Sequence, residues 1–589
     1  MSAASPAIPL SRSDFLARAR VELNLVYGEH APDILQRLEA LITQHQQGVT
    51  CEPRPLWSEQ TQMMITYGDS IIEGEDSVPL EVLECFMREH LEGTFSAVHI
   101  LPFFTWSSDD GFSVIHYRRV SPSVGDWPQV RHLAGRFNLM FDLVINHVSR
   151  ESLWFIDYLA DTPPGRDYFI ELPEQTDVRS VTRPRNTPLL TPVSTRRGMR
   201  HVWATFSEDQ IDLNFANPDV LIEMVGVLLY YLSQGARLIR LDAIAYLWKT
   251  LGTSCIHLPQ THAIVRLLRA VMEHVAPGAL LLTETNVPHH ENLSYFGAGD
   301  EAHIIYQFTL PPLLLHTLTT GDARALTEWA ATLPPLPTGC TYLNFTASHD
   351  GVGVRALEGL LPRHDIDALL ELMQRFGGFI SMKTDPDGQD SPYEINITYF
   401  DALQGTRRGA DAWQIARFIC SQTIMLGLQG IPAVYIHSLL ATLNDHEGVT
   451  RTGRLRAINR KRWQREALDL LLEAYSTPTH IVFEALTARL KVRREEPCFH
   501  PDTPQKIIDL GPHFFAFLRG PLPDGRRLLA VHNVTDKPHP LHLPEAYANH
   551  HWRDLLGRID PDAESPVLKP YRSCWLINED QGPRTRLKV

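Results

Sequence analysis

Four short apolar runs in this chain each end in polar residues that could do acid–base or nucleophilic chemistry. They are DLVINH (142–147), RLIRLDA (237–243), LLLTETN (280–286) and FTASHD (345–350). An apolar run of this length that stops in charge is typical of a buried parallel strand whose C-terminal end opens onto a cleft. The runs deliver three carboxylates, Asp242, Glu284 and Asp350. They predict a carboxylate-based active site at the top of a barrel.

Two carboxyl groups that flank the anomeric carbon of a sugar can break or form a glycosidic bond. One must be ionised as nucleophile, and the other must carry a proton, so less polar surroundings must raise its pKa. Asp242 and Glu284 suit these two roles. At a separation of ~5–5.5 Å they would react through a covalent glycosyl-enzyme and retain configuration. Arg240 shares the strand face of Asp242, and its charge is expected to keep Asp242 ionised.

Three further residues of these runs could assist. Asp350 could bind vicinal sugar hydroxyls, while His147 and His349 could donate to hydroxyls and to developing charge. Taken singly, each residue has a plainer interpretation. A strand-end aspartate often caps a turn or helix, and the Arg240–Asp242 pair could be only structural. The coincidence of all six at successive strand ends favours the site.

Eight strand candidates between residues 63 and 438 alternate with helical segments, which predicts an α/β protein built on a (β/α)8 TIM barrel. We place the catalytic barrel at 61–478. A Pro-, Arg- and Thr-rich stretch at 151–215 is expected to be an inserted, loop-rich subdomain over the cleft. Residues 1–60 predict an N-terminal helical extension, with Ser13 and Asp14 capping its first helix. Short alternating segments in 479–589 predict an antiparallel β domain.

Composition narrows the function classes. The chain has 589 residues with 44% apolar content and a net charge of −15, which argues against nucleic acid or anionic membranes as main partners. Its seven cysteines show no CxxC pair, so neither a zinc site nor a disulfide framework is predicted. We expect a cytoplasmic protein, because no signal-peptide core and no membrane-spanning apolar run are present.

The four runs resemble, in order, the signature regions of the α-amylase superfamily of glycoside hydrolases and transglycosylases. The resemblance implies that Asp242 is the nucleophile, Glu284 the acid/base and Asp350 the stabilising carboxylate. Further segments resemble the sucrose phosphorylase subfamily, which transfers a glucosyl unit between an α-glucoside and inorganic phosphate with retention. Examples are HILPFFTWSSDDGF (99–112), NHVSRESLWF (146–155), SHDGVGV (348–354) and AINRKRW (457–463).

The subfamily resemblance extends to the substrate-binding residues. It implies that Asp109 and Arg456 hold the non-reducing glucose at the −1 site, walled by Phe112 and Tyr246. An Arg-Pro-Arg sequence matches one in the sucrose enzymes. Its arginines, Arg183 and Arg185, are therefore candidates to bind an anion on the acceptor side, because arginine binds carboxylate or phosphate with two parallel hydrogen bonds.

Departures from the sucrose enzymes also fall on the acceptor side. Thr285 and Asn286 replace Val-His after the acid/base, and the segment 392–396 reads PYEIN in place of Leu-Tyr-Gln-Val-Asn. Tyr393 and Glu394 are thus further acceptor-side candidates, although a carboxylate there would repel an anionic acceptor unless it pairs with an arginine. These features resemble the glucosylglycerate phosphorylases, which convert 2-O-α-glucosyl-D-glycerate and phosphate to α-glucose 1-phosphate and D-glycerate.

The resemblance therefore implies small-molecule partners: an α-glucoside, inorganic phosphate and D-glycerate. No organic cofactor is implied. Asn146 resembles a calcium-ligand position of amylases, but its neighbours do not, so we predict no metal. Sucrose phosphorylase, sucrose 6′-phosphate phosphorylase and glucosylglycerol phosphorylase remain alternatives that differ in the acceptor. A plain hydrolase and a catalytically inactive barrel that serves as a binding subunit are two more.

Overall fold

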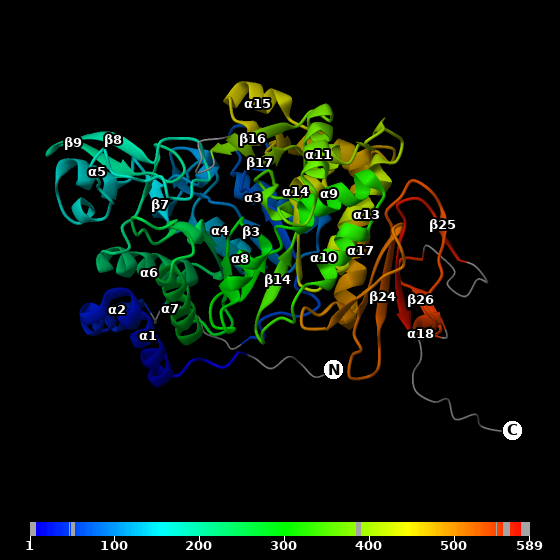
Figure 1. Cartoon of the computed structure of the whole chain (residues 1–589), viewed down its shortest axis with the longest axis horizontal. Helices are drawn as coiled ribbons and strands as arrows, with labels where there is room; N and C mark the ends of the chain where they lie inside the picture. Colours follow the sequence, from blue (N-terminus) through cyan, green and yellow to red (C-terminus); the bar gives the residue numbers. More distant parts are fainter. Residues whose placement is uncertain are drawn as a thin grey trace.

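A closed barrel of eight parallel strands forms the centre of the protein, as the sequence predicts (Figure 1). The computed structural model describes residues 7–45, 48, 54–384, 390–548, 550–557 and 566–578. The barrel order is β1-β20-β14-β13-β12-β11-β6-β3, so strands consecutive around the barrel are also consecutive in the chain. The strands are β1 (Met63–Thr66), β3 (Ala97–Ile100), β6 (Asn138–Val144), β11 (Ala236–Asp242), β12 (Leu280–Thr283), β13 (Ile304–Tyr306), β14 (Thr341–Asn344) and β20 (Ile431–Tyr435).

Helices between the strands cover the barrel, because strands this apolar must be buried on both faces. Helix α6, for example, begins behind the Asn217 cap and ends at Ser233. Gly235 follows with φ +100°, and a Cβ there would lie 2.6 Å from that of Ala134, so the turn into β11 requires glycine. The larger helices of the barrel are α3 (Pro79–His90), α4 (Trp127–Ala134), α6 (Pro218–Ser233), α7 (Pro259–Val275), α9 (Leu310–Thr320), α10 (Arg324–Ala331), α11 (Arg363–Arg375), α13 (Gln414–Gly427), α16 (Arg465–Glu473) and α17 (Pro478–Glu495).

The position of the seventh strand differs from the prediction. We expected FTASHD (345–350) to be the strand, whereas β14 is the preceding TYLN segment and FTASHD is the loop beyond it. Thr341 and Asn344 are polar, so this strand does not show the continuous apolar pattern of a buried parallel strand. Asn344 is nevertheless buried, because its side-chain amide donates to the carbonyl of Gln429 at 2.9 Å. Asp350 therefore lies six residues past the strand end.

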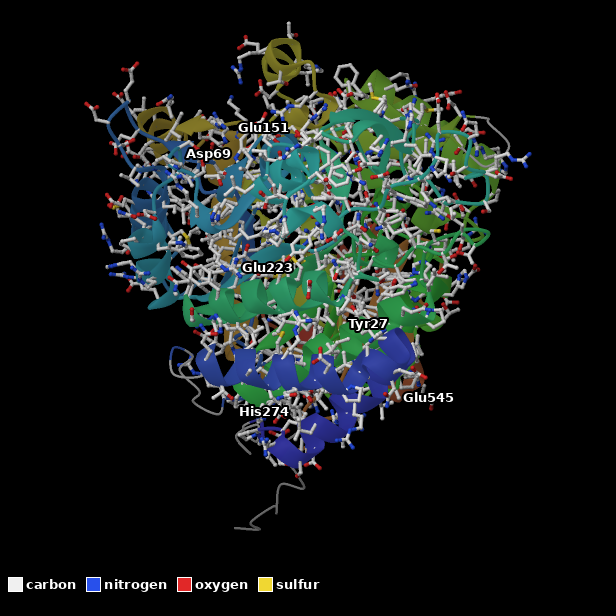
Figure 2. All side chains as sticks on the ribbon, turned by 90° about the vertical axis from the view of Figure 1, so that its left-hand side faces the viewer. Tyr27, Asp69, Glu151, Glu223, His274 and Glu545 are labelled. Atoms are coloured by element: carbon white, nitrogen blue, oxygen red, sulfur yellow. The ribbon has the colours of Figure 1, made fainter. Side chains whose placement is uncertain are left out.

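The N-terminal extension folds as two helices, α1 (Arg12–Tyr27) and α2 (Ala31–His45), that pack on α7 and α6. Tyr27 and His274 mark this boundary in Figure 2: the Tyr27 hydroxyl donates to the carbonyl of Phe215, and His274 stacks on Phe15. The predicted cap is wrong by two residues, since Ser11 caps α1 by accepting from the backbone of Asp14.

The segment 151–215 folds as the arm at the upper left of Figure 1. It contains α5 (Leu153–Ala160) and the hairpin of β8 (Leu190–Thr195) and β9 (Gly198–Trp203). Its return strand β10 (Gln210–Asp212) pairs with β7 (His147–Ser149), directly after β6. A second excursion near this arm forms a small sheet of β15 (Val352–Gly353), β17 (Asp390–Asn396) and β16 (Phe379–Thr384).

The C-terminal sheet is antiparallel, in the order β22-β23-β24-β28-β26. The boundary that we placed at 479 falls at the start of α17, which packs against α13, and the sheet itself begins at Gln505. Its strands are β22 (Gln505–Ile508), β23 (Phe514–Arg519), β24 (Leu528–Asn533), β26 (Trp552–Asp554) and β28 (Ser573–Asn578). Of the helices in the described residues, none is long and apolar enough to cross a membrane.

Short elements complete the described fold. They are β2 (Ile71–Ile72), β4 (Phe104–Trp106), β5 (Val114–Val120), α8 (His289–Leu293), α12 (Tyr399–Ala402), β18 (Gly405–Thr406), β19 (Gly409–Ala410), α14 (Ile436–Leu439), α15 (His446–Thr452), β21 (Trp463–Gln464), β25 (His539–Pro540), α18 (Glu545–Ala548) and β27 (Val567–Leu568).

Candidate active site

The three carboxylates that the sequence singles out line one cavity at the C-terminal ends of the barrel strands. Asp242 is the last residue of β11, and Glu284 directly follows β12. The two strands pair in register, and the backbone N–H of Glu284 donates to the carbonyl of Leu241 at 3.1 Å. Asp350 reaches the same cavity from the loop after β14. Parallel pairing thus brings together residues that are far apart in the chain.

Arg240 lies beneath Asp242 and is itself buried. Its Nη1 donates to Oδ1 of Asp242 at 2.7 Å and also binds the buried carboxylate of Asp142. His99 contacts the other oxygen of Asp142 at 2.6 Å. Burial raises the pKa of Asp242, and the charge of Arg240 opposes that rise. The guanidinium therefore offsets part of the effect of burial on Asp242, whose pKa stays above its ordinary value.

Glu284 has the properties of a proton donor at neutral pH. Burial, with smaller contributions from the charges of Asp242 and Asp350, raises the pKa of Glu284 to about 7. One of its oxygens, Oε2, accepts a hydrogen bond from the backbone N–H of Ala243 at 3.2 Å. The site therefore sets a carboxyl group that keeps its proton up to about pH 7 beside one that a guanidinium contacts, the division of roles that glycosidic chemistry requires.

Asp350 stays ionised in this site. Burial alone would raise its pKa, but nearby guanidinium groups, first those of Arg456 and Arg460, hold the pKa below its ordinary value. Arg456 contacts Asp350 through Nη1 at 2.5 Å. Burial lowers the pKa of His349 well below its usual range, so this imidazole is neutral. Neutral His349 can donate one hydrogen bond without adding a charge.

An aromatic and histidine wall forms another side of the cavity. The rings of Phe112 and His349 stack with centroids 4.7 Å apart. His147 approaches the carbonyl of Phe112 through Nε2 at 3.0 Å. Tyr246, from the short turn that follows Asp242, also lines the cavity. These four predicted residues all line the cavity.

The turn that carries Asp109 has an unusual backbone. Asp109 and Asp110 both adopt positive φ, 52° and 49°, and Gly111 follows at 113°. A Cβ on Gly111 would lie 2.5 Å from the carbonyl oxygen of Pro102, so only glycine fits. Asp110 accepts from Arg460 at 2.5 Å and pairs with Arg454 at 2.6 Å. These ion pairs hold a strained turn that presents Asp109 to the cavity.

On the acceptor side, only one of the two candidate arginines, Arg183 and Arg185, lines the cavity. Arg185 lines the cavity, and its guanidinium lies 5.5 Å from the ring centroid of Tyr393. Arg183 does not line the cavity and instead binds the carbonyl of Thr187. Asn286 lines the cavity too, while Glu394 is not among the lining residues and pairs with Arg456, which is.

Comparisons with known proteins agree with this geometry. A family model described as alpha amylase, catalytic domain, matches residues 92–350. The glucosylglycerate phosphorylase of Escherichia coli (strain K12) is 43% identical over 94% of this chain and 98% of its own length. The sucrose phosphorylase of Agrobacterium vitis is 31% identical over 74% of this chain and 88% of its own. The chain belongs to the glucosylglycerate phosphorylase family, within the α-amylase superfamily.

A solved structure is consistent with this membership. The sucrose 6F-phosphate phosphorylase from Thermoanaerobacter thermosaccharolyticum superposes with a TM-score of 0.71 and 26% identity, covering 81% of this chain and 94% of that one. The α-amylase from H. orenii, at 16% identity and a TM-score of 0.64, shares the fold.

Gln210 and Phe206 also line the cavity of this glucosylglycerate phosphorylase family member, and the sequence analysis did not identify them. Gln210, from β10, places its amide nitrogen 3.3 Å from Nε2 of His147 and 3.4 Å from Oδ2 of Asp109. Phe206 packs its ring edge-on against Tyr246, with centroids 5.3 Å apart. Both come from the end of the inserted arm, where no periodic pattern marks the residues that return to the barrel.

The ammonium group of Lys249 lies beside Asn146, the residue that resembles a calcium-ligand position. Nζ of Lys249 lies 2.7 Å from Oδ1 of Asn146 and 2.7 Å from Oδ2 of Asp212. Asp212 also accepts from Thr205 at 2.6 Å. Within the described residues, no cluster of three or more His, Cys, Asp or Glu side chains could hold a metal ion.

Proposed function

We propose that this protein is a retaining phosphorylase that transfers the glucosyl unit of 2-O-α-glucosyl-D-glycerate to inorganic phosphate. The products are α-glucose 1-phosphate and D-glycerate. The observation that carries the proposal is the contrast within one cavity between Asp242, bound by Arg240 at 2.7 Å, and Glu284, whose pKa is raised to about 7. The family membership supports the acceptor.

In the first half of the reaction Asp242 attacks C1 of the glucosyl unit. The bond between C1 and the glycerate oxygen breaks, and Glu284 gives its proton to that oxygen as the electron pair moves onto it. The products of this half are a covalent glucosyl–Asp242 ester and D-glycerate. Asp350 and neutral His349 stabilise the ring as positive charge develops at C1.

In the second half phosphate takes the place of glycerate. A phosphate oxygen attacks C1, the ester bond to Asp242 breaks, and the carboxylate of Glu284 takes up the proton that phosphate loses. Two inversions at C1 give net retention. Phosphate is already a nucleophilic anion, so this half needs positioning more than base catalysis.

The donor and acceptor halves of the site have separate tasks. Asp109, Phe112, His147, Tyr246 and Arg456 bind the glucosyl unit at the −1 site. On the acceptor side Arg185 supplies charge and Tyr393 and Asn286 supply hydrogen bonds, with Arg183 supporting the loop that carries Arg185. The described cysteines are all free thiols, which supports a cytoplasmic location for the enzyme.

The test is a panel of acceptors with α-glucose 1-phosphate as donor. Phosphate release is measured with D-glycerate, fructose, fructose 6-phosphate and glycerol. We expect the highest kcat/KM with D-glycerate and a disaccharide-like product of α configuration. A higher value with fructose or fructose 6-phosphate would reassign the enzyme to a sucrose-type acceptor, and accumulation of free glucose in every reaction would make it a hydrolase.

A further inference from the structure

Arg355 is an arginine next to the acceptor side that no motif singles out. It follows β15, which pairs with β17 through Val352–Ile395 and Gly353–Glu394. Val354 lies between β15 and Arg355, and its backbone N–H donates to the carbonyl of Tyr393 at 3.1 Å. The backbone at Arg355 therefore lies beside Tyr393, which lines the cavity, although Arg355 itself is not among the lining residues.

The other side of the same segment lies against Asn286. A Cβ built on Gly353 would be 2.7 Å from both the nitrogen and the oxygen of the Asn286 amide. The segment that carries Arg355 is thus held between two cavity residues, one from the loop after β12 and one from β17. A side chain at 353 would have to displace the Asn286 amide.

The guanidinium of Arg355 lacks an anionic partner. Within the part of the chain that the structure describes, it forms no ion pair, and its Nε is buried without a hydrogen-bond acceptor. A buried donor on a cation that is left unsatisfied costs free energy. Such a group is suited to an anion that arrives with a ligand.

Arg185 is the second cation at this end of the site without a carboxylate partner among the described residues. Both charges act on Tyr246: burial raises the pKa of this tyrosine, and Arg355 and Arg185 each oppose the rise. Arg355 also lowers the pKa of His257, after burial, and Arg185 lowers that of Asp350. Both guanidinium groups therefore act on Tyr246, which lines the cavity.

We propose that Arg355 is the residue that selects a carboxylate-bearing acceptor, by pairing with the carboxylate of a small α-hydroxy acid whose hydroxyl is the leaving oxygen. Arg185, which lines the cavity together with Asp350, serves the phosphate that replaces the acid. The inference rests on the proposed function and deepens it. It explains how one site in a protein of net charge −15 accepts two different anions in turn.

The test uses Arg355→Gln, with Arg355→Lys as the conservative variant and Arg375→Gln as a control that removes the same charge from an exposed position on α11. Glucosyl transfer from α-glucose 1-phosphate is measured to D-glycerate and to the neutral acceptors glycerol and water. We expect kcat/KM for D-glycerate to fall roughly 10- to 100-fold in Arg355→Gln, the loss of a charge-assisted hydrogen bond.

The ratio of transfer to D-glycerate over transfer to neutral acceptors distinguishes binding from mere support of the fold. It falls in Arg355→Gln, recovers in part in Arg355→Lys and stays at the wild-type value in Arg375→Gln. An equal fall for charged and neutral acceptors would overturn the assignment of Arg355. If the wild type does not use D-glycerate, both the proposed function and the assignment of Arg355 are wrong. If the wild type uses D-glycerate but the ratio does not change in Arg355→Gln, only the assignment of Arg355 is wrong.

Discussion

Glu394 binds Arg456 through both carboxylate oxygens, with Nε 2.9 Å from Oε1 and Nη2 2.6 Å from Oε2. The third nitrogen of the same guanidinium contacts Asp350 at 2.5 Å. Arg456 thus joins strand β17, from the excursion over the cavity, to the loop that follows β14. The pairing also explains why Glu394 is compatible with an anionic acceptor. Arg456 neutralises the charge of this carboxylate, so Glu394 does not repel the acceptor.

Loss of this ion pair is expected to destabilise the protein and weaken sugar binding. Glu394 is buried, so Glu394→Leu leaves Arg456 with one partner and lowers the free energy of unfolding by about 2 kcal/mol. The cost is below that of a fully buried pair, because Arg456 keeps Asp350 and is partly exposed. Glu394→Gln, which keeps one acceptor oxygen, loses less. Urea denaturation against the exposed Glu371→Leu control measures both. Equal stability of Glu394→Leu and the control would contradict the account.

The pH dependence of the first half-reaction reports the proton on Glu284. Its pKa is raised from 4.5 to about 7, so the acid form is present below that pH and is lost as pH rises through it. We expect kcat/KM for glucosylglycerate, at saturating phosphate, to fall on the alkaline side of about pH 7. In ping-pong kinetics this parameter excludes the titration of phosphate. An α-glucosyl fluoride donor, which needs no acid, serves as the control and loses that fall; a flat glucosylglycerate profile on both sides of neutral pH would refute the role of Glu284.

The two arginines of the Arg-Pro-Arg sequence are expected to differ in effect. Arg185 lines the cavity, so Arg185→Ala raises KM for phosphate roughly 10- to 100-fold. Arg183 binds the carbonyl of Thr187 instead, so Arg183→Ala acts through the loop and has a smaller effect. Exposed Arg196, on the same arm, is the matched control. Initial rates of phosphorolysis decide the order, and a larger effect at Arg183 than at Arg185 would reverse our assignment.

Lys249 is expected to be structural. Its ammonium is the partner of the buried Asp212, so Lys249→Met leaves that carboxylate unpaired and lowers the free energy of unfolding by about 3 kcal/mol. Lys491→Met, at an exposed position of α17, is the control. EDTA leaves the activity of the wild type unchanged, because the site holds its own cation. Thermal unfolding of both variants tests the first claim; a Lys249→Met protein as stable as the control would show that the pairing is unimportant.

Much of the barrel was predictable because parallel strands buried on both faces leave a continuous apolar signal. The strand before Asp242 and the one before Glu284 stand where RLIRLD and LLLT predict them. The seventh strand was misplaced because TYLN carries polar residues whose partners are distant backbone groups. Asn344, for example, donates to the carbonyl of Gln429, and nothing local in the sequence reveals such a partner.

Residues that reach the cavity from irregular segments were harder to predict. Gln210 lies on the short strand β10, which pairs with β7 after the long inserted segment. Arg355 lies two residues after the two-residue strand β15. Neither segment is long enough to show a period. The pairing of Glu394 with Arg456 joins residues 62 positions apart, and the sequence alone left the place of that carboxylate open. Charge pairing across loops depends on the folded backbone, not on local pattern.

The central claim is that the glucosyl unit passes through a covalent bond to Asp242. The most direct measurement is mass spectrometry of the Glu284→Gln variant after incubation with α-glucosyl fluoride in the absence of phosphate. Fluoride leaves without an acid, and water cannot attack without a base, so the intermediate accumulates. We predict that the peptide containing Asp242 gains the mass of one anhydroglucose residue. The same peptide from the Asp242→Asn variant should show no such gain. A label on another residue, or none while fluoride is released in a stoichiometric burst, would contradict the account.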